Sequence, residues 1–145
     1  MARITVATTI ERSVADVWAD LEQIETHTSW MADAESITFL TEQRIGVGTR
    51  FECRTKIGPI SLTDVMEITR WEQAQCMGVR HTGIVTGWGE FTLKPIGEHR
   101  TEFSWAESLT FPWWLGGRFG EFFGRFVLGA IWRTNLRRLK TRLES

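Results

Sequence analysis

The run TRFECRTKIGPISLTDVMEITR, residues 49–70, decides how the middle of this chain folds. Its first half places uncharged residues at every second position, which are Phe51, Cys53, Thr55 and Ile57. Period-two alternation is typical of a β-strand with one buried face. Gly58-Pro59 then marks a tight turn, and a second alternating set begins at Ile60. The run therefore predicts two antiparallel strands, residues 49–57 and 60–70, joined by a hairpin.

Strand patterns continue on both sides of this hairpin. Further strands are expected over residues 3–11, 35–43, 75–82, 84–95 and 100–111. Successive strands with short turns predict an antiparallel meander. After the first strand, Ser13-Val14-Ala15-Asp16 has the form of a capping box that starts a short amphipathic helix. A second short helix or turn is expected within residues 22–33.

The last part of the chain, from Pro112 to about Glu144, predicts one long helix. Proline suits the first helical position. One stripe of this helix is largely apolar and holds Phe119, Phe122, Phe126, Leu136, Leu139 and Leu143. A run of strands followed by a long helix is a two-layer α+β arrangement, in which the helix covers the concave face of a curved sheet. Because a long helix cannot fill a strongly bent sheet along its whole length, we expect a cavity between them.

Composition limits the class of protein. The 145 residues suit a single domain, residues 1–145, and the eight Trp and nine Phe without any Tyr suit a wide apolar interior. A net charge of −1 argues against a nucleic-acid partner. The start of the chain shows no leader pattern and the two cysteines show no metal spacing. We therefore expect a cytoplasmic protein with no metal and no cofactor.

Several short motifs, spread over nearly the whole chain, match those of a known family. They are the strand-to-helix opening Ile10–Trp18, Trp30, the turn Gly46-Val47-Gly48-Thr49, and the closing Leu139-Lys140 with Glu144. In this order they resemble the START-like helix-grip superfamily (SRPBCC), in particular its polyketide cyclase/dehydrase-type branch, although Arg12-Ser13 stands where many members carry Ala-Pro. The resemblance implies a helix-grip fold of about six to seven strands. It does not fix function, since members include cyclases, dehydratases, lipid carriers, quinone-binding proteins and stress-related ligand binders.

Three polar residues lie in register with apolar strand faces, which makes them candidates for chemistry. Asp64, His81 and Glu107 each alternate with large apolar residues. If those faces line the interior, the three side chains project into the cavity, where burial shifts pKa values and marks functional sites. The alternatives are a bulge at Asp64, a backbone hydrogen bond for His81, and a solvent-facing strand end for Glu107.

Two pocket functions follow from this arrangement. The first hypothesis is a binding protein for a small hydrophobic molecule, such as a lipid, isoprenoid, quinone or polyketide-like ring. The expected ligand-binding residues are Trp30, Phe51, Asp64, Met66, Val79, His81, Trp105, Glu107, Phe119, Phe122 and Phe126. The second hypothesis is a metal-free cyclase or dehydratase that acts on an aromatic or polyketide-like substrate, with His81 as base and Asp64 or Glu107 as acid. Cys53 is interpreted as an inert core thiol.

The start of the predicted long helix is unusual in sequence. Trp113 and Trp114 precede glycines at positions 116, 120 and 124, which recur at every fourth residue and form a smooth groove. The groove is interpreted as a gate that widens the cavity. Close packing against another element and transient contact with a membrane surface are the alternatives. A third hypothesis is therefore an interaction protein that uses the two tryptophans, as a monomer or a homodimer.

Overall fold

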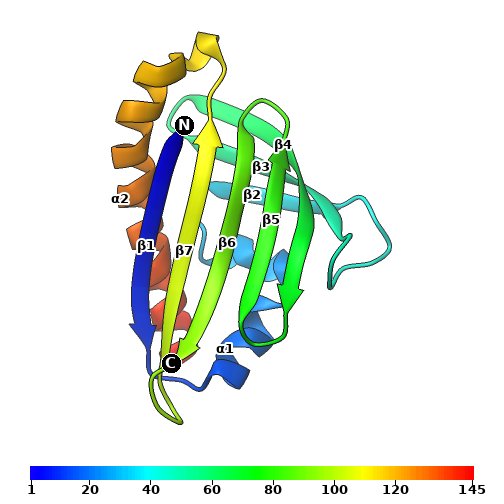
Figure 1. Ribbon diagram of the computed structural model, residues 1–145, viewed down its shortest axis with the longest axis vertical. Coiled ribbons are helices and arrows are strands. Elements are labelled where there is room, and N and C mark those ends of the chain that lie inside the picture. The colour runs from blue at the N-terminus through cyan, green and yellow to red at the C-terminus, as the bar shows by residue number, and fades with distance from the viewer.

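A computed structural model describes all 145 residues, and one seven-stranded antiparallel sheet forms its frame (Figure 1). The strands are β1 Ala2–Ile10, β2 Ala34–Phe39, β3 Arg50–Ile57, β4 Ile60–Glu72, β5 Cys76–Thr82, β6 Thr86–Pro95 and β7 Thr101–Thr110. Their order in the sheet is β1-β7-β6-β5-β4-β3-β2. Strands β2 to β7 thus form the expected meander, and β1 closes the sheet beside β7.

Two short helices, α1 (Val14–Leu21) and the 3₁₀ helix η1 (Ile24–Ser29), connect β1 to β2 at the opposite edge. Ser13 caps α1, because its hydroxyl accepts a hydrogen bond from the Asp16 backbone N–H at 3.2 Å. The Asp16 carboxylate lies 3.6 Å from Arg12 instead of returning to Ser13. Only one half of the predicted capping box therefore forms.

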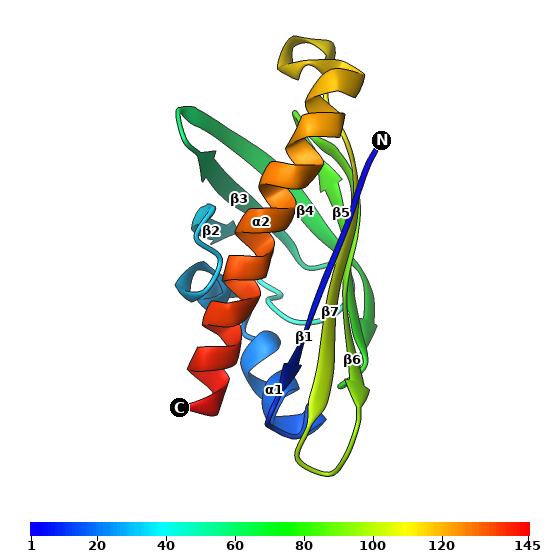
Figure 2. The ribbon, with the colours of Figure 1, turned by 90° about the vertical axis from the view of Figure 1, so that its left-hand side faces the viewer.

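The long helix α2 (Gly117–Glu144) crosses one face of the sheet, and the β2–β3 side bends toward it (Figures 1 and 2). Its inward face holds the buried side chains of Leu128, Trp132, Leu136, Leu139 and Leu143. The Trp132 ring stacks on Trp105 of β7, with centroids 4.4 Å apart and planes at 15°. The fold class predicted from the sequence, an α+β helix-grip arrangement, is confirmed.

The start of the last helix differs from its prediction. Pro112 has extended backbone angles and is followed by a 3₁₀ turn, η2 (Trp113–Leu115), and by Gly116 in the left-handed conformation at φ 92°. The α-helix therefore begins at Gly117 and not at Pro112. The left-handed residue changes the direction of the chain between η2 and α2, which explains why the segment is not one continuous helix.

The first turns of α2 extend past the ends of the strands, as Figure 2 shows. The first part of the stripe predicted to face inward is exposed: Phe119, Phe122 and Phe126 have exposed fractions of 78%, 51% and 58%. With about 3.6 residues per turn, these rings lie on a different side of the helix from Glu121 and Leu128, which are buried. The predicted stripe therefore combines two faces of α2, and its phenylalanines face away from the sheet. None of the helices is both long enough and apolar enough to span a membrane.

The division of α2 into a buried face and an exposed face predicts unequal responses to truncation. Leu139 is fully buried, whereas Val127 of the same helix is 50% exposed. Leu139→Ala should lower the free energy of unfolding by about 2–5 kcal/mol. Val127→Ala should change it by no more than about 0.5 kcal/mol. Urea denaturation followed by tryptophan fluorescence measures both; equal losses would contradict the division.

Candidate functional site

An internal cavity of about 160 Å³ lies between the sheet and α2. Of its 27 lining residues, 19 are hydrophobic, and they come from η1, from β2 to β7 and from α2. Leu128 and Trp132 form the helix side. An apolar cavity of about 150 Å³ holds a benzene-sized molecule, so this space suits a ligand of similar size.

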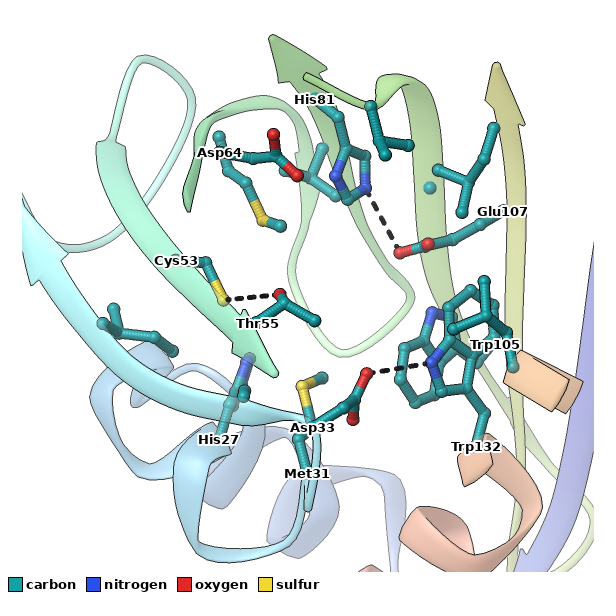
Figure 3. A pocket seen from close by; sticks show the side chains of 18 of the residues that line it. His27, Met31, Asp33, Cys53, Thr55, Asp64, His81, Trp105, Glu107 and Trp132 are labelled. Atoms are coloured by element: carbon teal, nitrogen blue, oxygen red, sulfur yellow. Dashed lines mark hydrogen bonds and ion pairs between the residues drawn. The ribbon is translucent and has the colours of Figure 1, made fainter. Parts of the chain in front are cut away.

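Two of the three polar candidates meet inside this cavity. His81 of β5 and Glu107 of β7 are both buried, and His81 Nε2 lies 3.3 Å from Glu107 Oε1 (Figure 3). A carboxylate accepts, so the imidazole N–H donates this bond. Asp64 of β4 is also buried and lines the cavity on the other side of the imidazole, as Figure 3 shows.

A glycine in the intervening strand makes this meeting possible. Strand β6 separates β5 from β7, and Gly89 of β6 is paired with Val79 on one side and Glu107 on the other. A Cβ atom at Gly89 would lie 2.6 Å from Glu107 Cγ. The Glu107 side chain therefore lies over the backbone of β6, where any larger residue would obstruct it. Glycine inside a strand was the sequence signal for this close approach.

Opposing influences act on the pKa of His81. Burial favours the neutral imidazole, but the charge and hydrogen bond of Glu107, together with the charge of Asp64, outweigh it, so the pKa is raised above 6.5. Burial also raises the pKa of Asp64, against the opposing effect of backbone N–H groups of Val85 and Ile84 and of His81. His81 and Asp64 therefore both favour their protonated forms, which suits acid–base catalysis near neutral pH.

Asp64 also holds the turn between β5 and β6. Its Oδ1 accepts a hydrogen bond from the Ile84 N–H at 3.0 Å. Gly83 has φ 146°, and a Cβ atom there would lie 2.5 Å from the same oxygen. Asp64 thus has a backbone hydrogen-bond partner in addition to its place in the cavity wall. It is the one of the three polar candidates whose side chain is hydrogen-bonded to the backbone.

The cavity wall contains part of a second polar cluster, which was not predicted from the sequence. Asp33 accepts hydrogen bonds from Asn135 Nδ2 at 2.8 Å and from Trp132 Nε1 at 3.3 Å. The side-chain oxygen Oδ1 of Asn135 accepts a hydrogen bond from the Ala32 N–H at 2.9 Å. These bonds join the segment before β2 to the C-terminal half of α2. The available signal in the sequence was an asparagine among the leucines of the helix, because a buried side-chain amide needs hydrogen-bond partners.

His27 is the other imidazole in the cavity wall, and its environment is unlike that of His81. Its Nε2 lies 2.7 Å from the Leu21 carbonyl, so this nitrogen donates. Burial lowers its pKa to about 4 because the remaining influences that favour the charged form are weaker. His27 is therefore neutral near pH 7. Burial likewise raises the pKa of Cys53 to about 11, which keeps this thiol protonated.

The remaining predicted residues divide into three groups. Those whose side chains line the cavity, besides the polar trio, are Phe51, Met66, Val79 and Trp105. Trp30 is fully buried but lies behind the lining, with its ring centroid 5.9 Å from that of Phe91 and 6.0 Å from that of Trp105. The three phenylalanines of α2 do not line the cavity, contrary to the prediction, because their side of the helix faces away from the sheet.

The glycine groove of α2 receives the ring of Phe111. A Cβ atom at Gly124 would lie 2.9 Å from Phe111 Cε2, and one at Gly120 would lie 3.4 Å from Phe111 Cδ2. Close packing, one of the alternatives, therefore describes the groove. Phe111 itself lines the cavity, so the groove holds one wall in place. No cluster of three or more His, Cys, Asp or Glu side chains is arranged to hold a metal ion.

A curved sheet that grips a long helix around an apolar cavity defines the START-like class of folds. A START superfamily protein from Mycobacterium smegmatis superposes with a TM-score of 0.79 at 11% identity, covering 99% of this chain and 98% of that one. The protein TTHA0849 from Thermus thermophilus gives 0.77 at 16%, covering 97% and 96%. The Zhui aromatase/cyclase from a Streptomyces species gives 0.73 at 16%, covering 97% and 90%. Identities this low show a shared fold alone.

The family itself follows from the sequence. Residues 1–144 match the sequence model of the family described as polyketide cyclase / dehydrase and lipid transport, and the chain belongs to this family. The family expected from the motifs is thereby confirmed. A comparison with curated proteins found no match.

The pairing of His81 with Glu107 predicts a pH-dependent contribution to stability. Because the folded pKa of His81 is raised, its proton stabilises the fold below about pH 6.5, and this contribution is lost as pH rises through the folded value. Glu107→Gln removes the charge that raises the pKa. The imidazole signal, assigned with His81→Asn, should titrate at lower pH in Glu107→Gln.

The difference in unfolding free energy between the wild type and Glu107→Gln should shrink as pH rises from about 6. An unchanged titration of His81 in the variant would show that Glu107 does not set its pKa. His27 serves as an internal control, since its pKa of about 4 lies below this window.

Proposed function

We propose that the protein binds a small, mostly apolar molecule with a ring and one polar group in the cavity between the sheet and α2. The observation that carries this proposal is the buried His81–Glu107 pair, 3.3 Å apart, in a wall that is otherwise mainly hydrophobic. Buried charged groups are costly without partners. A ligand hydroxyl or carbonyl directed at this pair would supply one.

The chemistry of the pair favours a hydrogen-bonding group on the ligand. Glu107 Oε1 accepts from His81, and Oε2 forms no hydrogen bond within the protein. A phenolic or enolic hydroxyl would donate to that free oxygen. The apolar remainder of the ligand would contact side chains such as Phe51 and Trp105. Polyketide-like rings and phenols meet both requirements, and family membership supports a ligand of this broad kind.

The proposal predicts selective binding of a phenol over its hydrocarbon analogue. Isothermal titration calorimetry with p-cresol and toluene compares two ligands that differ only by a hydroxyl. The wild type should prefer p-cresol by about tenfold, which corresponds to one hydrogen bond to a charged group. Glu107→Gln should reduce this preference. Equal affinities in the wild type would remove the pair from the binding role.

Filling the cavity should abolish binding of both probes. Val79→Phe adds a ring on the cavity face of β5 and should weaken p-cresol binding by more than about tenfold. Val65→Phe is the matched control, because Val65 lies on β4 but is absent from the cavity wall. Native mass spectrometry of gently purified protein would then identify any molecule carried from the cell. Full binding by Val79→Phe would place the ligand elsewhere.

A second candidate function, a cyclase or dehydratase activity, is supported by the proton-holding character of the same groups. Neutral His81 would take a proton from a carbon next to a carbonyl, and protonated Asp64 would give one to a departing hydroxyl, which leaves as water. The raised pKa of Asp64 favours the protonated form that this role needs, and the raised pKa of His81 makes its neutral form a stronger base once the proton has left. The ligand would then be a poly-β-ketone able to close into a ring.

This activity predicts that His81→Asn separates binding from turnover. The variant should still bind p-cresol within about tenfold of the wild type, because it keeps a polar group at the same place. It should form none of the cyclised or dehydrated product that the wild type makes from a poly-β-ketone, as measured by liquid chromatography and mass spectrometry. Product formation at the wild-type rate by His81→Asn would exclude the acid–base role.

A further inference from the structure

One end of the molecule is apolar and aromatic on its outside. Three segments meet there: residues 110–127, the β3–β4 turn at 56–63 and the β5–β6 turn at 82–88 (Figures 1 and 2). We call this surface the aromatic end. Its exposed large side chains are Trp113 at 86%, Phe119 at 78%, Phe123 at 64%, Phe126 at 58%, Trp114 at 53%, Phe122 at 51%, Val127 at 50%, Ile60 at 45%, Trp88 at 43% and Ile84 at 38%.

The charges of the aromatic end have one sign. Its exposed charged side chains are Lys56, Arg118 and Arg125. Its single acidic residue, Glu121, is buried, accepts a hydrogen bond from the Phe111 N–H at 3.0 Å and pairs with the amino group of Met1. The chain as a whole has a net charge of −1, so this end departs from the rest of the surface.

The arginines lie among the rings. The guanidinium of Arg125 lies 4.9 Å from the centroids of both Phe122 and Phe126. Cations interleaved with exposed Trp and Phe on a helix are the pattern of an element that lies in the interface of a membrane, where the rings enter the acyl boundary and the cations contact phosphates. A second copy of this chain would bring like charges together, with no free carboxylate at this end to pair them.

We propose that the aromatic end docks the protein on an anionic lipid bilayer. The outward face of the N-terminal part of α2 is free to lie on the surface because its rings are exposed. The cavity approaches the same end, since Ile57, Leu62 and Phe111 are half-buried lining residues that belong to its three segments or their borders. A docked molecule would therefore present this rim to the lipid. The docking itself does not depend on which ligand the cavity takes.

Vesicle flotation tests the docking with the complete chain. The protein should float with vesicles of phosphatidylcholine and phosphatidylglycerol in equal amounts, and much less with phosphatidylcholine alone. Replacing Trp113 and Phe119 together by Ser should weaken binding by at least about tenfold, because both rings are more than three-quarters exposed and leave the fold untouched. Trp88→Ser, at a tryptophan of β6 away from the helix, should have a smaller effect.

Charge provides the second arm of the test. Arg118→Gln and Arg125→Gln should each weaken binding to the anionic vesicles by about fivefold, and added salt should do the same to the wild type. Binding of p-cresol should be unchanged in all of these variants, so failure of the docking and failure of the cavity proposal are distinguishable.

Two outcomes would overturn the docking. One is wild-type protein that stays below the vesicles at low salt. The other is a dimer in analytical ultracentrifugation that the Trp113 and Phe119 double variant dissociates, without vesicle binding, which would assign the surface to a second copy of the chain.

Discussion

The contact of α2 with the sheet is the constraint on which the rest of this structure depends. The Trp132–Trp105 stack, at 4.4 Å, and the bonds from Asn135 and Trp132 to Asp33 hold the C-terminal half of the helix. Stacked aromatic pairs and buried polar bonds fix position as well as adding stability. Trp105 and Trp132 also line the cavity, so the contact that attaches the helix forms part of the cavity wall.

Burial alone does not explain how the two cavity histidines differ. His27 has a carbonyl partner and a pKa lowered to about 4, whereas His81 has a carboxylate partner and a raised pKa. Both are buried, so the partner decides which form the protein favours. The partner of His81 is available only because Gly89 leaves room over β6. Gly89, which has no titratable group, therefore decides whether Glu107 can reach His81 and raise its pKa.

The sequence was informative where a period repeats and less so where distant segments meet. Strand patterns located all seven strands and placed Asp64, His81 and Glu107 in register with apolar strand faces, but they left open whether those faces line the interior. They did not reveal that Glu107 reaches across a strand to His81, since the approach depends on the register of three strands. The stripe of α2 was placed on the correct helix, but it joined residues from two faces, and only the face that holds Leu136, Leu139 and Leu143 is buried. Asp33 was missed because its partners lie about 100 residues away.

The position of β1 has a consequence for how the chain acquires this shape. Strand β1 lies at one edge of the sheet and pairs with β7 from Ala2–Leu109 to Ile10–Thr101, whereas the next strand in sequence lies at the other edge. Strand β1 must therefore remain without its neighbour in the sheet until β7 has emerged from the ribosome, and without its covering helix until α2 has followed. Pairing across such a separation is slow because a large loop must close first. The interior can be sealed only as one of the last events of folding, which gives a nascent chain an interval in which an apolar small molecule could enter before the wall closes.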